Sequence, residues 1–496
     1  MHAPPADTPA LPPQQSAAPA WTDGRPTPAA TASAGRSEPP WWTWAVVSGL
    51  LLLYATLSLR THERLQSHSF DLAIFEQAVR SYAAGHLPVS EVKGPGFPLL
   101  GDHFSPVLAL LAPAYWIWPS ARTLLVAQAA LVAVSALPLM RWAHRALGTA
   151  AGVVVGVAYG LSWGIASGVG FDFHEWAFAV PLLACSLAAL GQGRPRAAVL
   201  WALPLLLVKE DMGLTVAVIG LLAAWRAGKG GRRLGIAAAV AGVAVAALVV
   251  GVVLPAFNPS GGYFYVGYVD GDGAGRSLGQ LLYAATIGLV TPEVKVTTLV
   301  MLLAPTLFLA VRSPLVLVAV PTLLWRGFSE YESHWGTGFH YSLILMPILF
   351  AAFVDALQRR GTTTAGLRRH LLGAAGVCVL LLPSHSLGQL FQPLFWKTDP
   401  RVAVAHHVMD RIPDGATVQA SDRLVPHLVH RTSVSLFGWP DSRPNPEWIL
   451  VDTRVAPELR WPLDALDESV ALAEARSRGY RTAAQESGFV LLSRTR

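Results

Sequence analysis

Residues 171–176 read FDFHEW and place an aspartate, a histidine and a glutamate within four positions, between two long apolar runs. Carboxylates can take a proton from a hydroxyl group, and carboxylates and imidazoles can bind a divalent cation. Four further clusters carry the same residue types: SFDLAIFEQ at 69–77, GDHFSP at 101–106, KED at 209–211 and SEYESHWGTGFHYS at 329–342. Whether the clusters act together depends on the elements that carry them and on the side of a membrane they face.

The composition of the chain is typical of a membrane protein. Hydrophobic residues make up 53% of its 496 residues and charged residues only 14%, whereas soluble proteins average roughly 25% charged residues. Several apolar runs reach about 18 residues, the length that crosses a hydrocarbon core of about 30 Å. The first run, at 41–59, follows forty residues and has no basic segment before it, so we expect a retained anchor rather than a cleaved signal peptide. The sequence therefore predicts an all-α polytopic membrane protein.

Charge and cysteine usage argue against other classes. The formal net charge of +6 is accounted for by basic cytoplasmic loops, so we expect no nucleic-acid partner. Cys185 and Cys378 both lie in apolar runs, which leaves no disulfide framework and no zinc-binding spacing.

Three regions follow one another along the chain. Residues 1–40 hold ten prolines and almost no aliphatic side chains, which predicts a disordered cytoplasmic tail. Residues 41–395 alternate apolar runs with polar breaks and form the predicted transmembrane domain. Residues 396–496 have a soluble pattern that predicts a small α/β domain. Its expected elements are strands at 416–421, 447–453 and 488–494 and a helix at 464–480.

The polar breaks form two sets that alternate along the chain. Five breaks, RWAHRALG, GQGRPR, WRAGKGGRR, VRSP and QRRGTTTAGLRR, hold thirteen Arg or Lys residues and no acid. The others hold fourteen acids against eight Arg or Lys residues; they lie at 60–105, 171–176, 209–211, 255–296 and 326–340. The positive-inside rule places the first set in the cytoplasm and the second outside. With the N-terminus inside, this arrangement predicts about eleven transmembrane helices and an extracytoplasmic C-terminal domain.

Residues 197–226 are predicted to form a hairpin rather than one helix. A single helix would place Lys209, Glu210 and Asp211 near the bilayer centre, at a cost of about 2.5–3.5 kcal/mol each. It would also separate two basic breaks that belong on the same side. Each leg of the hairpin spans only roughly 20 Å. We therefore expect the KED tip to lie below the membrane surface in a polar recess.

The acidic clusters thus share one side, which favours an extracytoplasmic active site, and each cluster also has a structural alternative. Asp71 is the candidate general base, or it faces the N-terminus of the helix that begins beside it. Asp102 and His103 bind substrate, or they cap a surface helix. Asp172, His174 and Glu175 bind substrate, or they form a solvated turn between two spans.

The last two clusters have alternatives of the same kind. The KED triplet binds substrate, or it neutralises itself so that the hairpin can turn. His340 and Tyr341 bind substrate, or they anchor a span at the membrane interface. The candidate substrate-binding residues are Lys209, Asp102, His103, Asp172, His174, Glu175, Glu210, Asp211, Glu76, Gln77, His340 and Tyr341.

A divalent metal is compatible with these residue types. Asp71, Asp102 and Asp172 suit magnesium or manganese, and imidazole also suits manganese. No spacing is specific for a metal, so the sequence leaves this question open.

Five motifs in order resemble one known family. FDLAIFEQA, LGDHFSPVLALLAPAYWIWPS, FDFHEWAFAVPLL, LLVKEDMGLTVAVIGL and GFHYS together resemble the membrane family called domain of unknown function 2079 (DUF2079), over roughly residues 60–450. This bacterial and archaeal family is similar in layout to polyprenyl-phosphate-dependent glycosyltransferases of GT-C type, such as protein mannosyltransferases and aminoarabinose transferases.

The GT-C resemblance implies a role for several elements. Asp71 matches the acidic first outer loop, HFSPVL the proline-containing surface helix, and FDFHE the acidic second outer loop. VKEDMG resembles a lysine-containing turn of the GT-C enzymes, and residues 396–496 correspond to the soluble outer domain that many of them have. Two positions depart from the pattern: the surface helix has the single Pro106, and Phe70-Asp71 replaces an Asp-Glu pair.

The leading hypothesis is a cell-envelope glycosyltransferase in a bacterial plasma membrane. It predicts a polyprenyl-phosphate sugar donor among membrane lipids, with Lys209 at the phosphate, and a glycan, lipid or protein acceptor whose hydroxyl gives its proton to Asp71. The alternatives are a transporter or flippase of a lipid-linked saccharide and a non-catalytic scaffold. Asp422, in QASDRLVPHLVHR, is expected to cap a helix rather than to act in catalysis.

Overall fold

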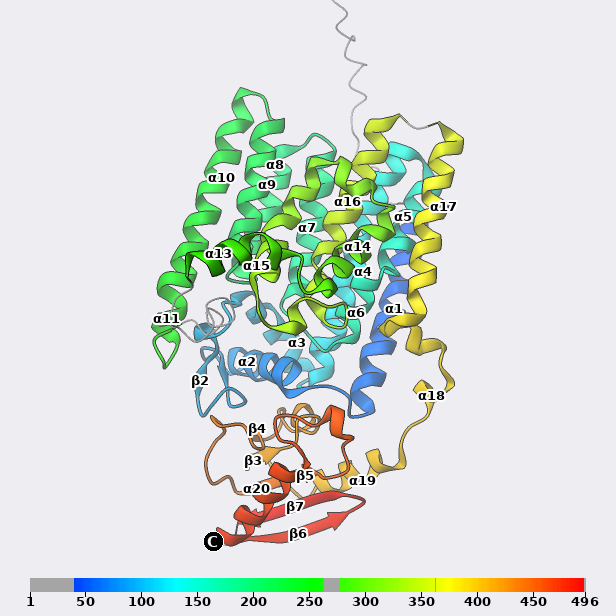
Figure 1. Ribbon diagram of the computed structural model, residues 1–496. Helices are drawn as coiled ribbons and strands as arrows, with labels where there is room; N and C mark the ends of the chain where they lie inside the picture. The colour runs from blue at the N-terminus through cyan, green and yellow to red at the C-terminus, as the bar shows by residue number, and fades with distance from the viewer. Residues whose placement is uncertain (1–39, 263–276, 362, 495–496) are drawn as a thin grey trace, which may run out of the picture. The chain divides into compact units, whose positions relative to one another are not determined.

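The structure, a computed structural model, describes residues 40–262, 277–361 and 363–494 (Figure 1). The predicted tail at 1–40 lies outside the described residues except for Pro40, and so does part of the predicted outer loop at 255–296. The described residues from Pro40 onward belong to one compact unit.

Five helices in the described residues are long and apolar enough to cross a membrane. They correspond to α1 (Trp41–Glu63), α4 (Ala121–Leu147), α10 (Lys229–Leu248) with its continuation, α16 (Leu345–Arg360) and α17 (Thr364–Leu381). If each of two bent pairs is one span, the total among the described residues is seven; the pairs are α5 (Thr149–Gly160) with α6 (Trp163–Gly170), and α13 (Leu278–Ala285) with α14 (Glu293–Leu303). The all-α membrane fold is therefore confirmed, while the count of eleven spans stays a prediction.

Shorter apolar helices fill the rest of the bundle. They are α3 (Ala112–Ile117), α7 (Trp176–Gly191), α8 (Pro195–Ala202), α9 (Met212–Arg226), α11 (Leu254–Phe257), α15 (Val320–Phe328) and α18 (Pro393–Trp396). Single turns connect them. Those that bear on the site are the π-helical turns η1 (Ser69–Ala73) and η5 (Val249–Val253) and the 3₁₀ turns η3 (Pro106–Leu111), η4 (Leu203–Leu207) and η12 (His340–Ser342).

The prediction of a hairpin at 197–226 is confirmed. The helix α8 and the turn η4 form one leg, the chain reverses at 208–211, and α9 forms the other leg and packs against α8. The helix α9 also packs closely on α10 through facing glycines. A Cβ atom at Gly220 would lie 2.6 Å from the carbonyl oxygen of Gly235, so a side chain there would push the helices apart. Small residues allow such close approach between membrane helices.

The five basic breaks meet at one end of the bundle. The carboxylate of Asp355 in α16 binds Arg226 at 3.3 Å and Arg359 at 2.8 Å, and it accepts a hydrogen bond from Ser313 at 2.6 Å. Trp142 donates to Gln358 at 2.9 Å, and Arg226 donates at 2.9 Å to the carbonyl of Leu190, next to the break at 191–196; these bonds link the remaining two breaks to the same place. Figure 1 shows the loops after α9 and α16 at this end, opposite the C-terminal sheet. The alternation of the breaks along the chain thus matches their position in space.

The C-terminal region is a small five-stranded sheet with helices beside it. The strand order is β4-β3-β5-β7-β6, with β3 parallel to both β4 and β5, and β7 antiparallel to β5 and β6. The three predicted strands and the predicted helix are confirmed; β4 and β6 are two strands that the sequence patterns did not indicate. The elements are α19 (Pro400–Met409), β3 (Thr417–Ala420), β4 (Ser433–Leu436), β5 (Trp448–Asp452), α20 (Ala465–Ser477), β6 (Tyr480–Glu486) and β7 (Phe489–Arg494).

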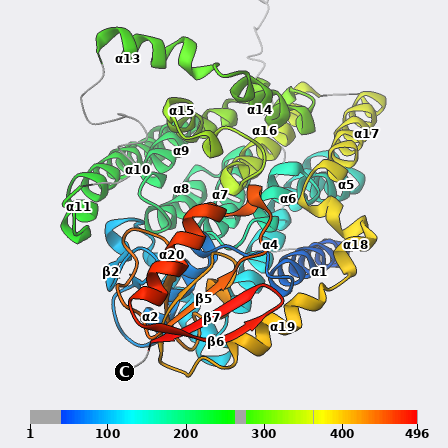
Figure 2. The same cartoon turned by 60° about the horizontal axis from the view of Figure 1, so that its bottom comes forward.

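The sheet is attached to the loop that follows α1. That loop contains α2 (Ile74–Ala83), β1 (Val89–Ser90) and β2 (Phe97–Pro98). Gln77 and Arg80 of α2 donate to backbone carbonyls of the sheet region, and Glu91 binds Arg443 at 2.7 Å. Figure 2 shows the strands and α20 in front of α2. The hydrophobic core is continuous from the bundle into the sheet.

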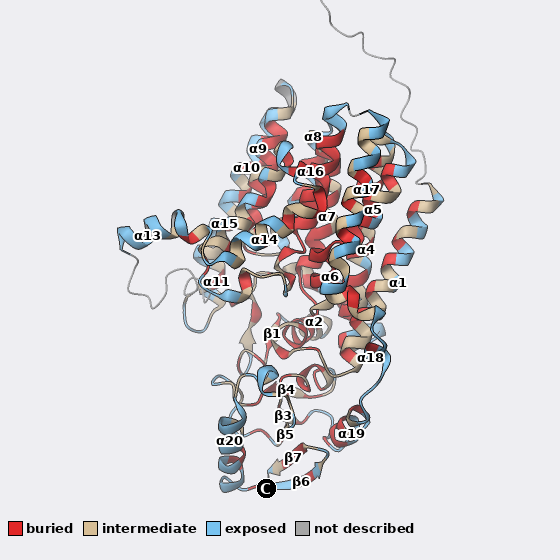
Figure 3. Ribbon diagram, turned by 45° about the vertical axis from the view of Figure 1, so that its right-hand side comes forward, coloured by how far each residue is buried: buried red, intermediate tan, exposed pale blue. Residues whose placement is uncertain are grey.

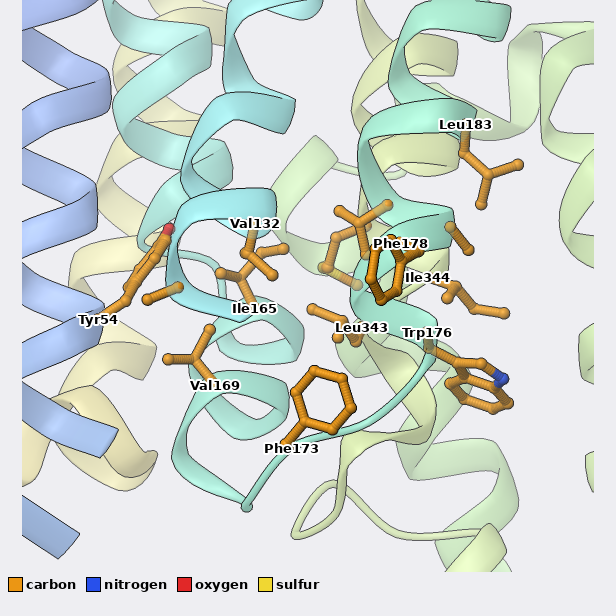
Figure 4. Close-up of a cluster of buried hydrophobic side chains, with 14 of the residues drawn as sticks. Tyr54, Val132, Ile165, Val169, Phe173, Trp176, Phe178, Leu183, Leu343 and Ile344 are labelled. Carbon is orange, nitrogen blue, oxygen red and sulfur yellow. The ribbon is translucent and has the colours of Figure 1, made fainter. Parts of the chain in front are cut away.

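Buried residues are concentrated in α4, α7 and α16 (Figure 3). Figure 4 shows Tyr54, Val132, Ile165, Phe178 and Leu343, from different elements, facing one another in this core. The hydroxyl of Tyr54 donates to the carbonyl of Gly160 at 2.8 Å, so even the polar end of this ring is satisfied. The core fixes α6 and α7 and therefore the FDFHEW segment between them.

Candidate active site

A cavity of about 720 Å³ lies between the bundle and the C-terminal sheet. Four of the five predicted outer breaks contribute side chains to its wall, and so do the membrane helices α9, α10 and α15 and the C-terminal region. The predicted site residues that line it are Asp71, His103, His174, Glu175, Lys209, Glu210, Asp211, His340 and Tyr341. Side chains from distant parts of the sequence thus meet in one hollow.

The FDFHEW segment is held in place by Gln128, a fully buried residue of α4. Its amide oxygen accepts a hydrogen bond from the backbone of His174 at 2.9 Å, and its amide nitrogen donates to the carbonyl of Asp172. Asp172 has a φ of 47°, in the left-handed region that Asp tolerates better than most residues. This turn lets Phe173 enter the core while His174 and Glu175 face the cavity.

Asp71 lies on η1, next to His174. One carboxylate oxygen of Asp71 is 3.5 Å from Nε2 of His174. Burial, together with the negative charges of Asp172 and Glu175, raises the pKa of Asp71 to about 8, although the charge of His68 opposes the shift. A carboxylate with such a pKa is a stronger base than an exposed aspartate.

Lys209 lies at the tip of the α8–α9 hairpin, and its side chain is only 15% exposed. Its ammonium group is 2.7 Å from Glu175 and 3.6 Å from Glu210, and 3.3 Å from Nδ1 of His103. It also lies over the ring of Trp176, 5.7 Å from the centroid. A cation is therefore fixed at the wall of the cavity by two carboxylates, an imidazole and an aromatic ring.

Asp422 belongs to the C-terminal region, but its side chain binds residues of the loop that follows α1. Its carboxylate accepts hydrogen bonds from the backbone and the hydroxyl of Ser69, at 2.8 and 2.6 Å, and lies 2.8 Å from Nδ1 of His68. The expectation that Asp422 caps a helix of its own region is therefore wrong: it binds the first residue of η1, two positions before Asp71.

The histidine bound to Asp422 has an unusual pKa. Burial alone would lower the pKa of His68, but the hydrogen bond to Asp422 and the charges of Asp172 and Asp422 raise it to about 9. His68 is therefore charged at neutral pH beside Asp71. No motif in the sequence singled out this residue, because its partner is more than 350 positions away.

Four candidate residues do not line the cavity. Asp172 accepts a hydrogen bond from the backbone of His68 at 2.8 Å, behind the wall. Asp102 is 3.2 Å from the ammonium group of Lys93 and 3.4 Å from Nε2 of His103, which both face the cavity in front of it. These two carboxylates therefore contact residues of the cavity wall from behind.

The other two lie on α2 and make structural contacts. Glu76 accepts a hydrogen bond from the hydroxyl of Tyr115 at 3.0 Å, and it is completely buried. Gln77 binds the backbone of Val434 and the side chain of Ser90. Ile74 and Phe75 at the start of α2 line the cavity, so the next two residues of the helix, Glu76 and Gln77, point away from it.

The cavity wall holds polar atoms whose hydrogen-bonding capacity is unused. Among the described residues, fourteen buried side-chain nitrogen or oxygen atoms have no hydrogen-bond partner, and seven of these belong to residues of this wall. They are Nε2 of His174, Oε2 of Glu175, Nε1 of Trp176, Oδ1 of Asp211, Nε1 of Trp325, Nδ1 of His340 and Nε of Arg423. Buried polar groups are normally paired, so this concentration indicates a polar ligand.

The three carboxylates considered for a metal have separate partners. Asp71 faces His174, Asp102 faces Lys93, and Asp172 faces the backbone of His68. Within the described ranges, no group of three or more His, Cys, Asp or Glu side chains is arranged to hold a metal ion.

The fold is similar to that of a protein of known structure. The chain superposes on crystal structures of ArnT from Cupriavidus metallidurans, one bound to undecaprenyl phosphate (TM-score 0.51) and one in the apo state (TM-score 0.50), each at 13% sequence identity. The alignments cover 91% and 92% of this chain and 98% of each ArnT chain. The predicted resemblance to GT-C-type polyprenyl-phosphate-dependent glycosyltransferases is therefore confirmed at the level of the fold.

The sequence itself defines the family. The model of the predicted membrane proteins called DUF2079 matches residues 61–491. The chain belongs to the DUF2079 family and is a membrane protein. A comparison with curated protein sequences gives no match.

Proposed function

We propose that this protein is a glycosyltransferase that moves a sugar from a polyprenyl-phosphate donor to an acceptor hydroxyl. The observation that carries the proposal is the cavity itself: Asp71 and Lys209 face one hollow, and in the described part of its wall seven buried polar atoms have no hydrogen-bond partner. A volume of about 720 Å³ is within the usual range for a ligand pocket, roughly 300–1,000 Å³.

The donor would enter from the helix side of the cavity. That wall is apolar, with Leu214, Ala246, Val250 and Pro321 from the membrane helices. A polyprenyl chain would lie along it, as the undecaprenyl phosphate in one ArnT structure suggests. Its phosphate would then reach Lys209, whose ammonium group supplies charge-assisted hydrogen bonds.

The chemistry would be a single displacement at the anomeric carbon of the donor. Asp71 takes the proton of the acceptor hydroxyl, the acceptor oxygen bonds to the anomeric carbon, and the bond from that carbon to the phosphate oxygen breaks. The phosphate leaves with the electron pair, and the ammonium group of Lys209, which is only 15% exposed, stabilises its charge. Glu175 and Asp211 each have one unpaired oxygen that would accept hydrogen bonds from sugar hydroxyls.

The membrane topology completes the proposal. We place the N-terminus and the five basic breaks in the cytoplasm of a bacterial plasma membrane, and the cavity and the C-terminal sheet outside. The grouping of the basic breaks around Asp355 supports this orientation, because cytoplasmic loops carry an excess of Arg and Lys. About eleven crossings then require several of the shorter helices to act as spans.

A gene deletion followed by chemical profiling of the cell envelope tests the proposal. Loss of one glycan together with accumulation of a polyprenyl-phosphate sugar, restored by the native gene but not by Asp71→Asn, is the expected result. The matched control is Asp410→Asn, a change at an exposed aspartate of the C-terminal region. A donor trapped on the cytoplasmic leaflet would instead indicate flipping, and an unchanged glycan profile would reject both functions.

A further inference from the structure

A second, smaller cavity of about 260 Å³ lies against the first loop and the C-terminal region. Five arginines line it: Arg64, Arg401, Arg423, Arg454 and Arg460. It shares Asp422, Arg423, Leu459, Arg460 and Trp461 with the wall of the large cavity. The two hollows therefore meet beside the carboxylate that positions η1 and Asp71.

The carboxylates of the small cavity are already engaged. Asp452 binds Arg401 at 2.5 Å and Glu468 binds Arg460 at 2.8 Å. Asp399 accepts a hydrogen bond from the backbone of α19 at 2.9 Å. The fourth, Asp422, is bound to His68 and Ser69 as described above.

Three of the five arginines therefore have no carboxylate partner in the small cavity. In the part of the chain that the structure describes, Arg64, Arg423 and Arg454 have no carboxylate within ion-pair distance. Nε of Arg423 is buried without a hydrogen-bond partner, and this residue faces both cavities. Arg64 and Arg423 are partly buried and Arg454 is exposed. Guanidinium groups bind phosphate and carboxylate oxygens in pairs.

Aromatic side chains around Trp461 lie where the two cavities join. Trp461 is 42% exposed, and its ring packs against Phe70 at 4.7 Å and Trp439 at 5.5 Å between centroids. Phe70 precedes Asp71, and Trp461 lines both cavities. A partly exposed, rigid aromatic face suits the apolar face of a sugar ring, and the nearby arginines suit an anionic substituent on it.

We propose that the small cavity binds the anionic group of the acceptor, so that the acceptor is an acidic saccharide. This inference rests on the proposed function and deepens it. The donor occupies the helix side of the large cavity, and the acceptor enters from the C-terminal side, with its charge at Arg423 and Arg454 and its sugar on Trp461. Its hydroxyl then lies toward Asp71, which takes the proton when the new glycosidic bond forms.

Binding of defined sugars to the full chain in lipid nanodiscs tests the inference. The probes are glucose 6-phosphate, glucuronate and glucose at constant ionic strength, and all measurements use a Lys209→Gln background so that Lys209 contributes no anion site. We expect glucose 6-phosphate or glucuronate to bind at least 10-fold more tightly than glucose. Which of the two binds better assigns the anionic group as phosphate or carboxylate. Equal affinity for all three sugars would overturn the inference.

Charge-removing variants locate the site. Arg423→Gln with Arg454→Gln should weaken binding of the preferred anionic sugar by about 10- to 100-fold. The control Arg476→Gln, on the exposed face of α20, should leave it unchanged. Arg423→Lys with Arg454→Lys keeps the charge and should restore part of the affinity, which separates lost recognition from misfolding. Retained affinity in the Gln variants would contradict the inference. Because no sugar donor is used, these results are independent of whether transfer occurs.

Discussion

At the scale of single residues, the carboxylate of Asp71 is expected to set the pH dependence of sugar transfer. Its raised pKa of about 8 means that the base form exists mainly above that pH, so kcat/KM should rise with pH and level off above about 8. The charge of Asp172 is one cause of the raised pKa. In Asp172→Asn the rising part of the pH–rate curve should move to lower pH by roughly one unit, because a negative charge next to Asp71 is removed.

The Asn side chain still accepts the hydrogen bond from His68 and tolerates the left-handed backbone at this position. The measurement is a pH–rate profile of sugar transfer for the native protein, Asp172→Asn and the control Asp410→Asn. If the rate rises over the same pH range in Asp172→Asn as in the native protein, Asp71 is not the titrating group.

The ammonium group of Lys209 should govern affinity for the lipid phosphate. A hydrogen bond to a charged group is worth about 1.5–3 kcal/mol, which corresponds to roughly 10- to 150-fold in affinity. Lys209→Gln also leaves Glu175 and Glu210 without their cation, so the site would repel phosphate. Titration of undecaprenyl phosphate into nanodiscs should show this loss, whereas Lys397→Gln, at an exposed position, should bind normally. Equal affinities in both variants would remove Lys209 from the donor site.

At the scale of elements, α4 positions the FDFHEW segment through Gln128. Gln128→Ala removes both bonds to that segment and leaves the backbone groups of Asp172 and His174 buried without partners. We expect a loss of about 1–3 kcal/mol in stability, a lower Tm and slower transfer. The exposed Gln392 provides the control, since Gln392→Ala removes no side-chain contact of this kind. An unchanged Tm in Gln128→Ala would mean that the core alone orients the segment.

The sequence predicts elements better than it predicts their partners. The hairpin at Lys209 follows from charge and length, and the strands at 417–420, 448–452 and 489–494 follow from their apolar patterns. Glu76 and Gln77 belong to a recognisable motif, but the face of α2 on which they lie depends on packing against Tyr115 and Val434. The role of Gln128 could not be predicted from the sequence, because its contacts are with Asp172 and His174, more than forty positions away.

At the scale of the whole molecule, Asp422 joins the C-terminal region to the loop that carries Asp71. Asp422→Ala removes the acceptor for the backbone N–H of Ser69 and the partner of His68. Hydrogen exchange of residues 69–73 should become about 10- to 100-fold faster, since charge-assisted bonds that hold this turn closed are lost. The control Asp414→Ala, at a carboxylate that is 83% exposed, should not change it. Unchanged exchange in Asp422→Ala would show that η1 is held by the bundle alone.

The contact between His68 and Asp422 also marks the limit of sequence reasoning. Periodicity and motifs describe neighbours along the chain, whereas these two residues meet only after the bundle and the sheet have packed together. The sequence predicts that the acidic clusters share one side of the membrane, and folding selects which of their residues face the cavity. Asp71 and Lys209 face it; Asp102 and Asp172 stand behind it.

The most direct test of the central claim is the rate of transfer by Asp71→Asn. The measurement is release of the sugar from its polyprenyl phosphate, and its appearance on the acceptor, by the full chain in nanodiscs. Loss of the general base should slow turnover by about 10²- to 10⁴-fold while binding of undecaprenyl phosphate stays unchanged. Turnover equal to that of the native protein would contradict the assignment of this cavity as a site of sugar transfer through Asp71.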